Sequence, residues 1–95
     1  MEYRESRRPC RYDVTFDMAG RPARATIVNV SRTGGYARGD FFPLEGDTMR
    51  FTLLGMPVGV VVTRSTRGGN FAFSFDRPLD NRQLDTIRGG PARRH

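Results

Sequence analysis

Apolar and polar residues alternate with a period of two through most of the chain, a pattern typical of half-buried β-strands. Four segments show it, at residues 12–18, 23–29, 49–53 and 71–75. A short run at 36–38 and a β-branched run at 58–63 complete the six predicted strands. The alternation is cleanest at Phe71, Phe73 and Phe75, where Ala72 and Ser74 lie between the aromatic residues. We expect the three phenylalanines in the core and the residues between them on the outer face.

Turn-forming sequences separate these segments. Glycine and proline predict hairpin connections at residues 19–22, 54–57 and 67–70, and a loop with a tight turn at 42–47. Consecutive strands joined by such short connections pair antiparallel.

The last part of the chain changes period and predicts a short helix. Asp80 can cap its first turn, Gln83 stands where a capping box needs it, and Leu79 can pack against Leu84. Leu84 and Ile87 would face the sheet.

Six short strands followed by one short helix predict a fold dominated by β-structure, a six-stranded antiparallel β-barrel with a C-terminal α-helix. Closing the sheet also removes exposed strand edges. We expect a single domain over residues 1–90, with an arginine-rich arm at 4–11 and the helix at 80–88, followed by a disordered tail at 91–95.

Composition restricts the partner and the compartment. All 16 basic residues are arginine and the net charge is +6, which favours an anionic partner. The single cysteine, Cys10, excludes an internal disulfide and fits a reducing compartment. The chain has neither an apolar run of the about 20 residues that a membrane span needs nor a signal peptide, so we expect a soluble cytoplasmic protein.

Two short motifs suggest a binding site. Arg7-Arg8-Pro9-Cys10-Arg11 precedes the first strand, and Asn29-Val30-Ser31-Arg32-Thr33-Gly34-Gly35 follows the second. If residues 19–22 form a hairpin turn, Arg11 lies roughly opposite Val30 and the two motifs meet. Arginine forks match phosphates and the O6/N7 edge of guanine.

The second motif adds complementary groups. Asn29 has donor and acceptor atoms for a base edge, and the Ser31 hydroxyl can bind a phosphate or a base, or hold the turn. Gly34 permits close backbone approach or a positive φ. Each motif also has an ordinary structural interpretation, since Asn-x-Ser before two glycines is a common strand ending and an arginine-rich arm is often merely solvated. Cys10 is either an incidental small residue or, between arginines, a redox thiol of lowered pKa.

Together, the motifs and the barrel pattern resemble the PilZ family, bacterial receptor modules for cyclic di-GMP. Residues 7–11 match its Arg-x-x-x-Arg arm, and residues 29–34 match its Asp/Asn-x-Ser-x-x-Gly motif. The resemblance implies that the following residues bind cyclic di-GMP: Arg7, Arg8, Arg11, Asn29, Ser31 and Gly34. It implies a monomer or a ligand-linked dimer, and a protein partner that reads the bound state.

Other function classes receive less support from the residues. A nucleotide-independent PilZ-like adaptor that works through protein contacts is the alternative, and a small basic barrel binding nucleic acid comes after it. Most aromatic residues alternate inward instead of forming a stacking face for bases. An enzyme is the least favoured class, because the only histidine is His95 and the sequence has no paired carboxylates, metal-spaced ligands or activated nucleophile. We therefore expect no catalytic residue, metal or cofactor.

Overall fold

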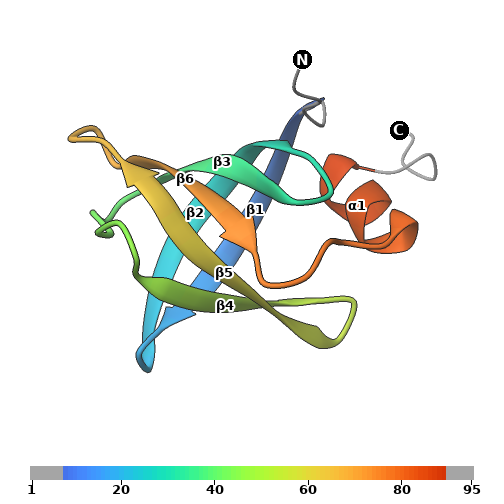
Figure 1. Cartoon of the computed structure of the whole chain (residues 1–95), viewed down its shortest axis with the longest axis horizontal. Coiled ribbons are helices and arrows are strands. Elements are labelled where there is room, and N and C mark those ends of the chain that lie inside the picture. Colours follow the sequence, from blue (N-terminus) through green and yellow to red (C-terminus); the bar gives the residue numbers. More distant parts are fainter. Residues whose placement is uncertain (1–7, 90–95) are drawn as a thin grey trace, which may run out of the picture.

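The chain folds into a closed six-stranded antiparallel β-barrel with one short C-terminal helix, as the alternation predicts (Figure 1). The computed structural model describes residues 8–89. Its elements are β1 (Arg8–Met18), β2 (Arg21–Val30), β3 (Gly34–Gly39), β4 (Thr48–Leu53), β5 (Met56–Ser65), β6 (Asn70–Phe75) and α1 (Asn81–Arg88). Around the barrel the strands run β1-β2-β3-β6-β5-β4.

A cluster of aromatic rings fills the barrel. Phe16 is fully buried and meets Phe51, Phe71 and Phe73 with ring centroids 5.4, 6.0 and 6.3 Å away, in edge-on geometry. Phe75 is also buried, so the predicted aromatic ladder of β6 lies in the core. Ala72 and Ser74 between them lie on the outer face and are only half-buried.

Two hairpin turns are tighter than the sequence predicts. Met18 pairs with Arg21, and Leu53 pairs with Met56, so each turn has only two central residues. Ala19 and Gly20 have φ of 54° and 86°, and Leu54 and Gly55 have φ of 52° and 78°. Type I′ turns require positive φ at both central positions and match the twist of the strands. The expected turns at 19–22 and 54–57 were therefore too long.

Leu54 is an unfavourable residue for its turn, because a side chain with a Cβ is strained at positive φ. The side chain is also 49% exposed. Asparagine tolerates this backbone conformation, and Asn-Gly is the preferred type I′ pair. We expect Leu54→Asn to raise the free energy of unfolding by about 1 kcal/mol in urea denaturation. Thr52→Asn, at an exposed strand position, should give no such gain, and an equal gain there would contradict the turn explanation.

Helix α1 has the predicted capping box. The Gln83 backbone N–H donates to Asp80 Oδ1 at 2.8 Å, and the Asp80 N–H donates to Gln83 Oε1 at 2.9 Å. Gly89 ends the helix in the left-handed conformation. Leu84 and Ile87 are buried. The helix contacts β1 and β2 and lies at one end of the barrel (Figure 1). Within residues 8–89, no helix has the length and apolar character to span a membrane.

Candidate functional site

The two motifs meet where β1 begins and β2 ends. Arg8 pairs with Val30, and Pro9 pairs with Asn29. The predicted pairing of Arg11 with Val30 was wrong, because the tight turn at Ala19–Gly20 and an irregularity between Pro9 and Tyr12 displace the register. The expected juxtaposition nevertheless exists, since residues 8–9 lie beside residues 29–30.

The described part of the arginine motif is β-strand and not a separate arm. Residues 8–11 belong to β1, although we expected them in an arm that precedes the first strand. Arg11 is exposed. Because Pro9 pairs with Asn29 and Tyr12 pairs with Ile27, both Cys10 and Arg11 lie opposite Val28. Only the backbone of Arg8 is described, and Arg7 lies outside the described residues.

Register irregularities in the pairing of β2 with both of its neighbouring strands determine which face of the sheet the Asn29 side chain lies on. One lies between Pro9 and Tyr12 on β1, and the other lies between Ile27 and Asn29 in the pairing of β2 with β3. Ile27 and Val30 are both fully buried, which strict alternation does not allow. Between Ile27 and Asn29, β2 has one residue more than β3, namely Val28. Without this extra residue, Asn29 would share the inner face with Ile27. It is instead half-buried, beside the described part of the arginine motif.

The Asn29 side chain holds an unsatisfied acceptor. Its Oδ1 is buried and receives no hydrogen bond from any residue between 8 and 89. A buried acceptor in this state costs about 1–3 kcal/mol, so it usually has a partner. A ligand N–H would recover that cost once the Asn29 side chain turns, because Oδ1 is not accessible to solvent in this conformation.

The buried side chain of Ser31 forms hydrogen bonds within the turn that follows β2. It is only 2% exposed, and its Oγ accepts from the Thr33 N–H at 3.3 Å and lies 3.4 Å from both Thr33 Oγ1 and the Gly34 carbonyl oxygen. The Ser31 N–H also donates to the Gly34 carbonyl oxygen at 2.8 Å. In this conformation the hydroxyl serves the turn, the structural alternative that the sequence left open.

Gly34 serves close packing between strands. It is absent from the residues with positive φ among those described, so of the two expected reasons for this glycine only close backbone approach applies. A Cβ at this position would collide with the Phe73 carbonyl oxygen of β6. Close backbone approach is thus required, but the approaching backbone belongs to the protein itself.

We call the start of β1 and the end of β2, residues 8–11 and 29–34, the motif corner. Arg32 connects this corner to α1, a role that sequence reasoning missed. Its guanidinium donates to the Leu79 carbonyl oxygen at 3.1 Å and to Asn81 Oδ1 at 2.9 Å. The Leu79 N–H returns a bond to the Arg32 carbonyl oxygen at 2.8 Å. Residues 29–34 and the start of α1 are therefore one connected unit. No local signal reveals contacts between residues so far apart in the sequence.

Cys10 differs from a reactive thiol. Burial raises the pKa of its thiol, and the positive charge of Arg88 only partly opposes this shift. The thiol lies 3.4 Å from the Ile27 carbonyl oxygen, to which it can donate. A redox cysteine needs a lowered thiol pKa, and the pKa of Cys10 is raised, so this alternative is wrong.

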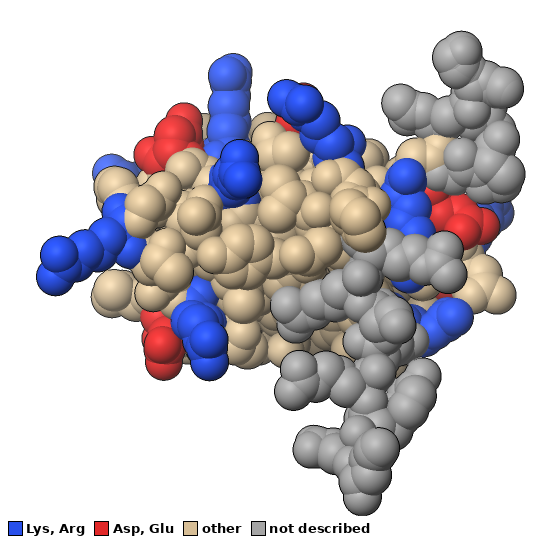
Figure 2. Space-filling model, turned by 90° about the horizontal axis from the view of Figure 1, so that it is seen from above, with Lys and Arg blue, Asp and Glu red and all other residues tan. Residues whose placement is uncertain are grey.

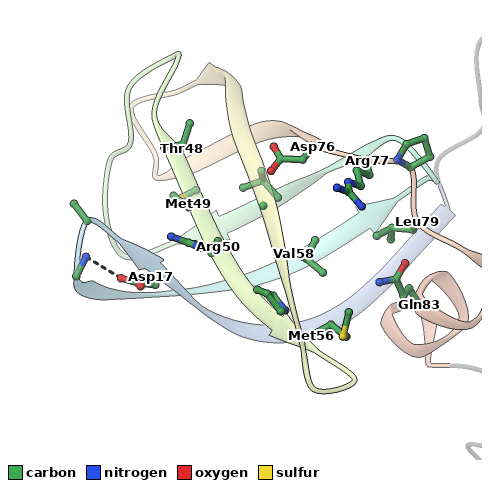
Figure 3. Close-up of a pocket in the computed structure, with 16 residues that line it drawn as sticks. Asp17, Thr48, Met49, Arg50, Met56, Val58, Asp76, Arg77, Leu79 and Gln83 are labelled. Carbon is green, nitrogen blue, oxygen red and sulfur yellow. Dashed lines mark hydrogen bonds between the residues drawn. The ribbon is translucent and has the colours of Figure 1, made fainter.

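Two grooves on the described surface lie away from these motifs. The larger, about 820 Å³, runs over β4 and β5 and the segment before α1, with Arg50, Val58 and Leu79 in its lining (Figure 3). The second, about 580 Å³, lies over β1–β3 and includes Arg24 and Arg38. Neither is lined by a predicted site residue.

Comparison with known proteins finds no match for this chain among family models, curated proteins or solved structures.

Proposed function

We propose that the protein is a PilZ-type receptor for cyclic di-GMP. The observation that carries this proposal is the pairing of Arg8 with Val30 and of Pro9 with Asn29, which joins the two motifs at one end of the barrel. The closed barrel with a C-terminal helix is also the fold that the PilZ resemblance implies. Both short motifs have a ligand role only if they are adjacent, and the register makes them so.

The donors and acceptors divide between the two strands. Arg11 is exposed at the start of β1 and carries a fork suited to phosphate or to the guanine O6/N7 edge. Asn29 has a buried Oδ1 without a donor among residues 8–89, and a turn of its half-buried side chain would present this acceptor to the N–H groups of guanine. Arg7 and Arg8 would add positive charge from the same segment. Ligand binding would change the surface that residues 8–11 and 29–34 form, and a protein partner in the cytoplasm would read the change.

The test is isothermal titration with cyclic di-GMP in moderate salt. We expect Arg11→Ala and Asn29→Ala each to weaken binding by about 5- to 150-fold, because each loses a contact worth about 1–3 kcal/mol. Arg67→Ala is the matched control, since Arg67 is an exposed arginine in the β5–β6 turn. No binding by the wild type at tens of micromolar ligand, or an equal loss in Arg67→Ala, would contradict the proposal.

A nucleotide-independent adaptor is the second candidate, and Ser31 is the observation that favours it. Its hydroxyl is buried within the turn instead of facing a ligand. An adaptor would capture the same protein partner with and without cyclic di-GMP, whereas a receptor's capture would change with the nucleotide.

A further inference from the structure

An outward-facing aromatic residue lies directly beside Asn29. On β3, Tyr36 pairs with Asn29 of β2 on one side and with Ala72 of β6 on the other. Residues directly opposite in an antiparallel pair share a face, with Cβ atoms about 5 Å apart. Tyr36 and Ala72 are both half-buried, while Ala37 and Phe73, their chain neighbours, are fully buried. The Tyr36 ring therefore belongs to the outer surface.

A second row continues this surface. Ser74 of β6 pairs with Gly34 of β3 and with Val61 of β5. Tyr36, Ala72, Ser74 and Val61 form what we call the outer strip, and all four are uncharged and half-buried. Figure 2 shows the molecule from above the view of Figure 1, and the middle of that view has few charged side chains, with arginines around it.

Two exposed arginines flank the outer strip. Arg38 is two residues beyond Tyr36 on β3 and therefore on the same face, and Arg64 pairs with Ala72. The surface thus offers one aromatic ring and small side chains beside two exposed arginines. This arrangement suits a flat base that carries phosphates at its margin.

We propose that the outer strip is the floor of the nucleotide site, on which a purine base lies flat and stacks on Tyr36. This inference rests on the proposed function, since it places the base whose edge Asn29 binds. A planar base reaching from β2 toward β6 crosses β3, and Tyr36 is the side chain in its path. The small Ala72 and Ser74 leave the surface beyond the ring low enough for a base. Tyr36 is then a ligand-binding residue outside both sequence motifs.

The experiment titrates cyclic di-GMP into the wild type, Tyr36→Ala, Tyr36→Phe and Ala72→Gln. Stacking needs the ring and not the hydroxyl, so Tyr36→Ala should weaken binding about ten-fold or more and Tyr36→Phe should retain it within about three-fold. Ala72→Gln should weaken binding about ten-fold by raising a side chain into the base's position. Thr52→Gln is the matched control, because it adds a glutamine at an exposed position of β4. Thermal melting of each variant confirms that it is folded.

Ligand NMR gives a readout that a purely structural role for Tyr36 would not affect. The purine H8 signal should move upfield when the wild type binds, and the shift should shrink in Tyr36→Ala at saturation. If Arg11→Ala weakens binding while Tyr36→Ala and Ala72→Gln do not, the outer strip is not the floor and the receptor function stands. Equal losses in Tyr36→Phe and Tyr36→Ala would overturn stacking. A wild type that does not bind overturns both proposals.

Discussion

A Gly34→Ala variant is expected to lose about 3 kcal/mol of unfolding free energy. The new Cβ would collide with the Phe73 carbonyl oxygen and lie 3.2 Å from the Ser74 Cα. Both atoms are backbone of the neighbouring strand, so the clash is not relieved by turning a side chain. Gly34 pairs with Ser74, and β3 must separate from β6 there. Overpacking of this kind typically costs about 1–3 kcal/mol, and backbone displacement places this position at the upper end.

Urea denaturation of Gly34→Ala beside Gly68→Ala checks this expectation. A Cβ at Gly68 would meet only Asn70 Nδ2, at 3.9 Å, and Gly68 is not among the residues with positive φ. The control should therefore stay within about 0.5 kcal/mol of the wild type. Equal stability of both variants would show that β3 and β6 do not approach as closely as the structure shows.

This expectation changes how binding data from the corner must be interpreted. Ser31 and Gly34 both belong to the motif that resembles a ligand site, yet each has a structural task in the described conformation. A loss of binding in a Ser31 or Gly34 variant would mix folding with recognition. Arg11, Asn29 and Tyr36 are more exposed to solvent than these two residues. Binding tests therefore belong at these three positions.

Local signals predicted most of the fold. Strict alternation at Phe71, Phe73 and Phe75 requires one buried face, and this result needs no knowledge of distant contacts. The capping box at Asp80 and Gln83 likewise depends only on residues within one turn of helix. These elements could therefore be found from sequence, with boundaries a few residues from those observed.

The candidate site was less predictable because its geometry depends on pairing. A short turn at Ala19–Gly20 and the irregularity before Tyr12 decide that Arg8, and not Arg11, lies opposite Val30. The direction of Asn29 depends on an irregularity beside β3 that no residue type signals. The reason for Gly34 is a carbonyl group on β6, which only the closed barrel brings near. Sequence reasoning found the motif residues and left the turn role of Ser31 open, but it could not identify the β6 backbone as the group that approaches Gly34.

Phe73→Ala is expected to have a still larger effect, a loss of about 3–5 kcal/mol in unfolding free energy. The side chain is fully buried, and its ring centroid lies 5.3 Å from that of Phe75, 6.2 Å from that of Phe71 and 6.3 Å from that of Phe16. Removing the ring leaves a cavity at the centre of the aromatic cluster. The cavity would also lie beneath the candidate site, because the Phe73 backbone packs against Gly34.

Urea denaturation measures this loss against Phe42→Ala, which truncates a phenylalanine that is 67% exposed and should change stability by less than about 0.5 kcal/mol. Phe73→Leu keeps most of the apolar volume and should lose less than Phe73→Ala, which provides a folded variant if the alanine form does not fold. Cavity formation predicts the order Phe42→Ala, Phe73→Leu, Phe73→Ala for increasing loss. Equal losses in the two alanine variants would contradict a core organised around Phe73, because a buried ring and an exposed ring would then contribute the same free energy.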